Sequence, residues 1–332
     1  MTTKNKQIVL AARPKGAPQE SDFRLVENEL PEPADGEVLV KNVFLSLDPY
    51  MRGRMNEGKS YAKPVELGDV MVGATVGPVI ASRHPKLAVG DTVVAYLGWQ
   101  EYGVARGETL MKVDPELVPI AAYLGAVGMP GVTAWYGLLD IGKPKAGETV
   151  VVAAASGAVG GIVGQLAKIK GCHAVGIAGG KDKCEYVVKE LGFDVCLDHR
   201  DPALKEQFKE ATPKGVDIYF ENVGGQILDM VLGRLAPFAR IPLCGLVSQY
   251  NATEAYAVKS FGALLTSRAS VQGFIVSEHM ERWPAALAEL GKYVAEGRIK
   301  YRESIAEGVE NAPKAFIGML AGKNFGKQLV KL

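Results

Sequence analysis

The first third of the chain alternates short apolar runs with turn residues, a pattern typical of β-strands. Glycine, proline and aspartate separate the runs, as in Pro33-Ala34-Asp35-Gly36, and no long helical period occurs before about residue 115. This spacing predicts a small antiparallel β-barrel or β-sandwich. The expected strands are Gln7 to Ala12, Glu37 to Leu47, Val70 to Ala81, Asp91 to Leu97 and Tyr102 to Arg106.

The hydrophobic period changes after Pro119, where strand-length apolar runs alternate with segments of helical length. Such alternation predicts an α/β fold with a doubly wound parallel sheet. The expected strands are Thr149 to Ala154, His173 to Ile177, Val195 to Asp198, Val216 to Glu221, Ala239 to Cys244 and Val271 to Val276. The expected helices lie near 158–170, 181–191, 202–211, 225–235 and 278–297. A further helix and a short strand, Lys327 to Leu332, follow, and we expect this tail to return to the first domain.

The length of 332 residues exceeds what one hydrophobic core usually serves, so two domains are expected. We place a β-rich domain at residues 1–129 and 301–332, and an α/β domain at 130–300. A composition of 48% hydrophobic and 23% charged residues excludes a disordered chain. The net charge of +1 excludes a global attraction to nucleic acid or to an anionic membrane, so any basic site must be local.

The four cysteines all lie beyond the midpoint and form no C-x-x-C pair, so they are expected to be reduced thiols. The first ten residues contain no apolar core of signal-peptide length, which favours the cytoplasm. Two uncharged stretches, Leu117 to Leu139 and Thr149 to Ala167, are long enough to raise the question of a membrane span. Glycine interrupts both of them, so we expect no membrane segment.

The strongest chemical signal follows the first strand of the α/β domain. The run from Val150 to Ala167 reads as an apolar strand, a turn of small residues and an apolar helix. Within it, Ala155-x-Gly157-x-x-Gly160 fits the dinucleotide-binding fingerprint with alanine in place of the first glycine. Small residues let backbone N–H groups approach a pyrophosphate at a helix N-terminus. The alternatives are a tight turn in a glycine-rich core and the nucleoside site of a methyltransferase.

The end of the second strand decides between the two nicotinamide nucleotides. An NAD site usually carries Asp or Glu there, to bind the ribose 2′-OH. In this chain the strand ends Ile177-Ala178-Gly179-Gly180, without an acid, and Lys183 follows. His199 and Arg200 come directly after the third strand, at the same expected edge. The missing carboxylate and the converging cations favour NADP(H), although each cation alone also fits a solvated surface position.

The first domain lacks the ligands of a catalytic zinc site. Dehydrogenases that use zinc hold it with cysteine, histidine and carboxylate side chains. Residues 1–130 contain no cysteine and a single histidine, His84, beside Pro85 in an expected turn. We therefore expect no metal, and tyrosine is the remaining residue class that can supply a proton or stabilise an oxyanion.

Seven dispersed motifs occur in order along the chain: Leu45 to Arg52, Ala154 to Gly160, Tyr219 to Gly225, Cys244-Gly245, Ser248 to Asn251, Gln272 to Val276 and Asn324 to Lys327. With these motifs the whole chain resembles the medium-chain dehydrogenase/reductase superfamily. It is most similar to the zinc-free branch of leukotriene B4 12-hydroxydehydrogenase/prostaglandin reductases, plant double-bond reductases and bacterial curcumin reductases.

This resemblance implies a Rossmann domain that binds NADP and a GroES-like barrel domain that binds substrate. It implies an oxidoreductase of the EC 1.3.1 type that reduces the C=C bond of α,β-unsaturated ketones and aldehydes with NADPH. Hydride is delivered to the β-carbon, and the enolate that forms is protonated at the α-carbon. Relatives commonly pair sheet edges into a homodimer, and Val271 to Val276 is the apolar strand expected at such an edge.

The resemblance also implies the residues of the site. The family lysine that meets the 2′-phosphate falls on Lys183, whereas Asp198-His199 replaces a frequent Asn-Tyr pair, which leaves the role of His199 open. Tyr250 matches the position that steadies the substrate oxygen or donates the proton, and Tyr50 matches a tyrosine of the substrate pocket, with Tyr61 as another candidate. The implied cofactor-binding residues are Ser156, Gly157, Ala158, Val159, Gly160, Lys183, His199, Arg200, Asn222, Cys244, Tyr250, Phe274, Val276 and Asn324.

Other interpretations remain open from the sequence. A quinone reductase of the same fold, or a nucleotide-binding protein without turnover, would carry many of the same motifs. Tyr50 also fits a packed aromatic of a turn, and Tyr250 also fits a buried tyrosine with a satisfied hydroxyl. For Asp48 and Arg52 we expect a structural ion pair rather than a catalytic role.

Overall fold

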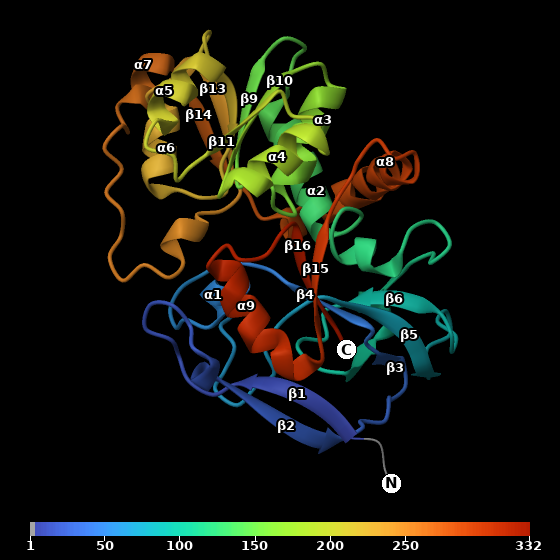
Figure 1. Ribbon diagram of the computed structural model, residues 1–332. Coiled ribbons are helices and arrows are strands. Elements are labelled where there is room, and N and C mark those ends of the chain that lie inside the picture. The colour runs from blue at the N-terminus through green and yellow to red at the C-terminus, as the bar shows by residue number, and fades with distance from the viewer. Residues whose placement is uncertain (1–3) are drawn as a thin grey trace. The chain divides into compact units, whose positions relative to one another are not determined.

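The computed structural model describes residues 4–332, and its chain divides into two compact units (Figure 1). The first unit contains the chain up to Gly125 together with Glu303–Leu332, and the second contains Ala126–Arg302. Within residues 4–332, no helix is both long enough and apolar enough to span a membrane.

The first unit contains an eight-stranded sheet with the order β15-β16-β4-β5-β3-β7; in addition, β6 pairs with β5, and β8 pairs with β6. A separate pair consists of β1 and β2. As expected, the pairs formed among strands before residue 115 are antiparallel, whereas β15 and β16 are parallel because helix α9 connects them as a crossover. The strands and helices are β1 (Lys4–Leu10), β2 (Phe23–Glu29), β3 (Glu37–Lys41), β4 (Phe44–Leu47), α1 (Met51–Arg54), β5 (Thr75–Ser82), β6 (Thr92–Ala95), β7 (Tyr102–Arg106), β8 (Met111–Lys112), β15 (Glu303–Glu307), α9 (Ala312–Leu320) and β16 (Lys327–Lys331).

One strand expected from the sequence is divided in two. The run from Glu37 to Leu47 forms β3 and β4, which separate at Asn42, where the side-chain amide donates to the Gln100 carbonyl at 2.8 Å. The backbone also crowds its neighbour here, since a Cβ on Gly77 would lie 2.0 Å from the Lys41 carbonyl oxygen. The break lets β4 pair with β16, so the C-terminal tail returns to this unit.

An aromatic cluster forms the centre of the first unit's core. The Trp99 ring stacks on Phe23 with centroids 5.4 Å apart and meets the edge of Phe316 at 5.4 Å. Phe316 lies on α9, so the C-terminal segment contributes to the same hydrophobic core as the first hundred residues. Met51, on α1, is completely buried in the same cluster and fixes the start of that helix.

The second unit is a six-stranded parallel sheet with the order β11-β10-β9-β12-β13-β14, as the alternation of strand and helix predicted. Val151 and Ala153 of β9 point to one face, where they pack in a cluster with residues of α5 and α6. Helices α3 and α4 lie on the other face (Figure 1). The elements are α2 (Met129–Tyr136), a π-helical turn (Gly137–Gly142), β9 (Thr149–Ala153), α3 (Gly160–Ile169), β10 (His173–Ala178), α4 (Lys181–Lys189), β11 (Val195–Asp198), α5 (Leu204–Ala211), β12 (Val216–Phe220), α6 (Gly225–Leu232), β13 (Leu235–Leu243), α7 (Ala263–Ser267), β14 (Ser270–Gly273) and α8 (Trp283–Ala295).

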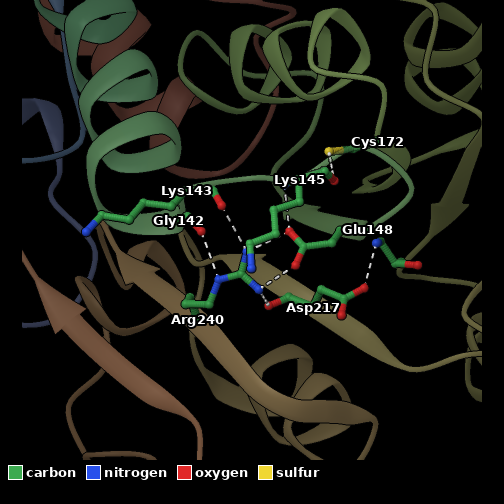
Figure 2. A network of polar contacts seen from close by, with 8 residues as sticks. Gly142, Lys143, Lys145, Glu148, Cys172, Asp217 and Arg240 are labelled. Atoms are coloured by element: carbon green, nitrogen blue, oxygen red, sulfur yellow. Dashed lines mark hydrogen bonds and ion pairs between the residues drawn. The ribbon is translucent and has the colours of Figure 1, made fainter.

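Arg240 and its hydrogen-bond partners Glu148 and Gly142, here called the Arg240 clamp, connect the amino ends of the central strands (Figure 2). The Arg240 guanidinium makes two hydrogen bonds to the Glu148 carboxylate, at 2.9 and 2.6 Å, and donates to the Gly142 carbonyl at 2.9 Å. Beside it, the Asp217 carboxylate accepts from the Thr149 N–H at 2.8 Å. Because the strands are parallel, this clamp lies at the edge of the sheet opposite their carboxyl ends.

Candidate functional site

The turn between β9 and α3 is so tight that it requires glycine at its last position. A Cβ on Gly160 would lie 2.4 Å from the Ala154 carbonyl oxygen, and one on Gly157 would lie 3.1 Å from the same atom. Ala154 itself has a left-handed backbone, with φ of +53°. Ser156 is buried within the turn, and Ala158 and Val159 are half-buried before the helix begins. The small residues leave the backbone N–H groups at the N-terminus of α3 accessible, and such groups bind a pyrophosphate.

The next strand, β10, ends at two glycines that are covered by side chains from the end of β11. A Cβ on Gly179 would lie 2.9 Å from Nε2 of His199 and 3.4 Å from the Arg200 guanidinium. The Asp198 carboxylate holds the two strand ends together, since it accepts from the N–H groups of Gly180 at 2.9 Å and Arg200 at 3.0 Å. Burial opposes ionisation of Asp198, but these N–H groups outweigh it and lower its pKa.

Two cationic residues, Lys183 and Arg200, and one histidine, His199, gather at this edge. Burial lowers the pKa of Lys183, and the charge of Arg200 lowers it further. Burial and the charge of Arg200 likewise lower the pKa of His199, with a smaller contribution from Lys183. Like charges that depress one another's ionisation form a site where an anion is favourable. The residues therefore fit the 2′-phosphate of NADP(H), with Lys183 half-buried and His199 and Arg200 exposed.

The ends of β12 and β13 continue the same edge of the sheet. The Asn222 side-chain amide donates to the Ala153 carbonyl at 2.8 Å, which ties the end of β12 to the end of β9. The buried Glu221 carboxylate accepts from the N–H groups of Val223 and Gly224, while burial raises its pKa. Cys244 donates its backbone N–H to Glu221, and burial, followed by the charge of that carboxylate, raises the pKa of its thiol to about 12. A thiol with so high a pKa stays protonated.

Tyr250 follows β13 and turns its hydroxyl back over its own loop. The Leu246 N–H donates to the Tyr250 hydroxyl oxygen at 3.4 Å. A Cβ on Gly245 would lie 2.9 Å from that oxygen, so glycine at this position leaves room for the phenol. The structure thus places the Tyr250 hydroxyl beside the carboxyl end of β13.

The two remaining candidates of the second unit, Phe274 and Val276, contact aromatic neighbours. The Phe274 ring lies 5.6 Å from Tyr136 and 6.4 Å from Phe220, measured between ring centroids. Val276 is buried, and its carbonyl accepts from the Trp283 indole at 3.1 Å. Both residues follow β14, so they continue the row of strand ends.

The remaining candidates belong to the first unit. Tyr50 precedes α1, and its pKa is raised above the usual value by burial, then by the charge of Asp48 and by the neighbouring Tyr96 and Tyr61. The hydroxyl of Tyr96 also has a raised pKa, of about 12, although 61% of its side chain is exposed. These phenols therefore remain protonated and able to donate hydrogen bonds. Asn324 donates to the Gly326 carbonyl at 2.8 Å.

Sequence reasoning missed four residues that shape these sites: Ala154, Glu221, Asp198 as a bridge between strands, and Tyr96. An acid at the end of a parallel strand is a signal that could have identified Glu221 and Asp198. The left-handed backbone of Ala154 and the grouping of Tyr96 with Tyr50 leave no mark in the sequence. In the described part of the chain, no group of three or more histidine, cysteine or acidic residues is placed to hold a metal ion.

Two family models match the chain. Residues 6–113 match one described as the N-terminal domain of oxidoreductase, and residues 158–292 match one described as zinc-binding dehydrogenase. The NADPH-dependent curcumin reductase of Escherichia coli (strain K12) is 50% identical over 99% of this chain and 97% of its own length. The 2-alkenal reductase (NADP(+)-dependent) of Nicotiana tabacum is 41% identical over 98% of this chain and 97% of its own length.

A solved structure is similar over nearly the same length. The crystal structure of CurA from Vibrio vulnificus in complex with NADPH aligns with a TM-score of 0.93 and 50% identity, covering 98% of each chain. Identity at this level, across both units, extends well beyond a shared fold.

Proposed function

Because the chain belongs to the medium-chain dehydrogenase/reductase superfamily, we propose that it reduces the C=C bond of α,β-unsaturated ketones and aldehydes with NADPH. The proposal extends to this chain the activity that the names of its curcumin reductase and alkenal reductase relatives describe. In it, the second unit binds the cofactor and the first unit binds the substrate.

One observation carries the proposal: Lys183, His199 and Arg200 gather beside the end of β10, which carries no Asp or Glu. The chain is also 50% identical to an NADPH-dependent curcumin reductase. A carboxylate there would repel the 2′-phosphate, whereas these cations attract it. The adenosine half of NADP(H) therefore occupies this edge, with its pyrophosphate on the backbone of Ser156 to Gly160. Within the second unit, the nicotinamide half is proposed to meet Asn222, Cys244, Tyr250, Phe274 and Val276.

The chain's own chemical contribution is to orient the reactants and to steady a growing negative charge. When bound, NADPH supplies the hydride that is added to the β-carbon of the substrate. The Tyr250 hydroxyl donates a hydrogen bond to the substrate oxygen as that oxygen gains enolate character, and it is the proposed source of the proton that completes the α-carbon. Glycine at position 245 leaves room for this hydroxyl, because a Cβ there would lie 2.9 Å from its oxygen.

Tyr50 and Tyr61 are the proposed substrate-binding residues. Burial raises the pKa of Tyr50, and Asp48, Tyr96 and Tyr61 each raise it further. The raised pKa keeps the Tyr50 hydroxyl protonated, and so able to donate a hydrogen bond, at physiological pH. Neutral donors on aromatic rings suit a substrate that combines an apolar conjugated chain with a carbonyl oxygen.

We propose that the reaction is independent of zinc. The first 130 residues supply no cysteine and one histidine, which is too few of the usual ligands for a catalytic zinc site in the substrate-binding unit. The tyrosine hydroxyls take the place of the metal as the electrophilic partner of the substrate oxygen.

The experiment that tests the proposal is NADPH oxidation with identification of the product, over enals, aryl enones and quinones. We expect consumption of NADPH with enals and enones, and a product whose C=C bond is saturated while its carbonyl remains. An allylic alcohol would show reduction at the carbonyl and contradict the proposal. Turnover with quinones alone would assign a quinone reductase, and NADPH binding without oxidation of any compound would assign a non-catalytic nucleotide-binding protein.

We also propose that the chain forms a homodimer through the edge of the second unit's sheet. The edge strand β14 has all four residues exposed, including Val271 at 46%. Beside it, Phe238 protrudes from β13 in a left-handed conformation, with φ of +62° and 65% of its side chain exposed. An exposed strand with apolar neighbours is a surface that a second copy can cover.

Light scattering after size-exclusion chromatography tests the dimer. We expect the mass of two chains for the wild type and of one chain for Val271→Asp, with Asp182→Asn, on the exposed surface of α4, as a control that keeps the dimer. A wild type with the mass of one chain at micromolar concentration would contradict the proposal.

A cytoplasmic location remains part of the proposal. Its support is that Cys172, Cys184, Cys196 and Cys244 are all free thiols, as expected for a reducing compartment. Fractionation of the native host with an antibody against the chain would check it, and recovery in a membrane or secreted fraction would contradict it.

A further inference from the structure

Helix α4 and strand β11 bring two cysteine thiols together at the proposed 2′-phosphate site. Cys184 lies in the second turn of α4, and Cys196 lies within β11, twelve positions later in the chain. The two thiols are hydrogen-bond partners, and both side chains are half-buried. No disulfide joins them, so the pair is a dithiol.

The backbone geometry explains why these two side chains meet. Cys196 is paired in register with Gly176 of β10, and a Cβ on Gly176 would lie 3.1 Å from Val187, one helical turn after Cys184. Leu197, the next residue of β11, points to the opposite face and packs with α5. Cys196 therefore faces α4, on the stripe of the helix that carries Cys184 and Val187.

The two thiols differ in their tendency to lose a proton. The hydrogen bond with Cys196 lowers the pKa of Cys184 more than burial raises it, and the backbone of Ala178 contributes in the same direction. The same hydrogen bond, together with burial, raises the pKa of Cys196. Cys184 is thus the thiol of the pair whose ionisation the surroundings favour, and the thiolate is the form of cysteine that reacts with oxidants.

We propose that Cys184 and Cys196 are a redox modification site, at which hydrogen peroxide converts the dithiol to a disulfide that weakens NADPH binding. The Cys184 thiolate attacks one peroxide oxygen, the O–O bond breaks, and a sulfenic acid and one water molecule form. The Cys196 sulfur then attacks the sulfenic sulfur, the S–O bond breaks, and the second water leaves as the S–S bond forms. In total the two thiols lose two protons and two electrons, and hydrogen peroxide is reduced to two waters.

The link to NADPH follows from the neighbours of each cysteine, and this part rests on the proposed function. Lys183 directly precedes Cys184, and Cys196 stands two residues before Asp198. The Asp198 carboxylate fixes the N–H groups of Gly180 and Arg200, so it sets the spacing between the two strand ends. A covalent bond is shorter than the contact between two hydrogen-bonded thiols, so the disulfide draws the first turns of α4 toward β11 and displaces Lys183.

Peptide mapping tests the covalent step on the full-length protein. The reduced protein is treated with hydrogen peroxide, remaining thiols are blocked with N-ethylmaleimide, and a non-reducing digest is analysed by mass spectrometry. We expect a peptide in which Cys184 is linked to Cys196 with the loss of two hydrogens, reversed by dithiothreitol. The link is lost in Cys184→Ser and in Cys196→Ser. It persists in Cys172→Ser, because Cys172 is buried, its pKa is raised to about 11 and it donates to the Lys145 carbonyl.

The absence of the linked peptide from the folded wild type, or its formation only in urea, would overturn the proposal. So would oxidation of Cys184 to the sulfinic acid while Cys196 stays alkylated, because it would show that the second thiol does not reach the first.

Fluorescence titration with NADPH tests the consequence. We expect the oxidised wild type to bind NADPH about tenfold more weakly than the reduced wild type, and Cys184→Ser, which lacks the reactive thiol, to bind equally well before and after peroxide treatment. A mapped disulfide with unchanged NADPH affinity would overturn the regulatory half of the proposal. If the reduced protein did not bind NADPH at all, the proposed function would fail, while the peptide map would still decide the disulfide.

Discussion

The ammonium group of Lys327 lies 2.5 Å from the Asp48 carboxylate, and the two side chains are only 4% and 7% exposed. Lys327 also donates to the Leu47 carbonyl at 2.8 Å, and the Ser46 hydroxyl donates to the other oxygen of Asp48. Burial lowers the pKa of Lys327, and the charge of Asp48 opposes this effect. The pair joins the last strand, β16, to the end of β4, directly before Tyr50.

Removal of this ammonium group should destabilise the protein strongly. Lys327→Met leaves the Asp48 charge buried without its counter-charge, and such changes cost about 3–5 kcal/mol of unfolding free energy. Urea denaturation would measure it, with Lys331→Met at the exposed end of the same strand as the control. We expect Asp48→Asn to recover part of the loss in the double variant. An unchanged urea midpoint for Lys327→Met would contradict the interpretation of the pair as a structural bridge.

The ion-pair partner of Asp48 could not be predicted from the sequence. The sequence suggested Arg52, four residues away, yet the structure pairs Asp48 with Lys327 across 279 positions. Arg52 donates instead to Asn56 and to the Gly16 carbonyl. A local spacing can be read from the chain, whereas a pair that depends on the return of β16 to β4 requires the tertiary fold.

The parallel sheet could be predicted because its information is local. Apolar strands, glycine turns and amphipathic helices alternate between Thr149 and Val276, and each element expected there lies within a few residues of its observed bounds. The short helix α7 was not predicted. The end of β10 without an acid was equally visible, so the edge that carries the proposed cofactor residues could be derived. The contact between Cys184 and Cys196 could not, because it depends on the position of α4 over β11.

Lys183 should determine the preference for NADPH over NADH. In Lys183→Met, loss of a charge-assisted hydrogen bond to the 2′-phosphate is expected to raise the dissociation constant of NADPH about 10- to 100-fold and to change that of NADH little. Fluorescence titration with both nucleotides measures this, and Lys181→Met, on the exposed first position of α4, is the matched control. An equal loss for NADPH and NADH would remove Lys183 from the 2′-phosphate site.

His199 should make cofactor affinity dependent on pH. In the free protein its pKa lies below the usual value because of burial and the charge of Arg200. A bound phosphate favours the protonated imidazole and raises that pKa, so affinity for NADP⁺ increases as the pH falls through the pKa of the complex. The increase stops once free His199 is also protonated.

The comparison with His199→Asn isolates this effect, because protonation of the 2′-phosphate itself acts on both proteins alike. We expect the ratio of wild-type to His199→Asn affinity for NADP⁺ to grow about fivefold to tenfold between pH 8 and pH 6. Calorimetric titration at several pH values would measure the ratio. A ratio that does not change with pH would show that His199 makes no contact with the phosphate.

Arg240 should affect stability and leave the cofactor site intact, because its clamp lies at the amino ends of the strands (Figure 2). Arg240→Met removes two hydrogen bonds to Glu148 and is expected to lower the free energy of unfolding by about 2 kcal/mol. NADPH affinity below the melting temperature should be unchanged. Lys143→Met is the control, because Lys143 contributes its backbone carbonyl and its side chain points away from Arg240. A large loss of NADPH affinity in Arg240→Met would show that the two edges are coupled.

Tyr250 should contribute to turnover rather than to cofactor binding. Tyr250→Phe keeps the ring and removes the hydroxyl that is proposed to steady the enolate and supply its proton, so kcat is expected to fall about 10²- to 10⁴-fold with NADPH affinity retained. The matched control is Tyr256→Phe, in the same loop region, because the Tyr256 hydroxyl donates to Asp229 and faces no proposed site.

A second variant tests the same hydroxyl without removing it. In Gly245→Ala the new methyl group would lie 2.9 Å from the Tyr250 oxygen, so the phenol must move. We expect kcat to fall with the hydroxyl still present, and little further loss when Tyr250→Phe is added, because both changes act on one group. Steady-state kinetics with a single enone measures all three variants. Full turnover in Tyr250→Phe would assign the proton to another donor and leave Tyr250 as a packing residue of the loop after β13.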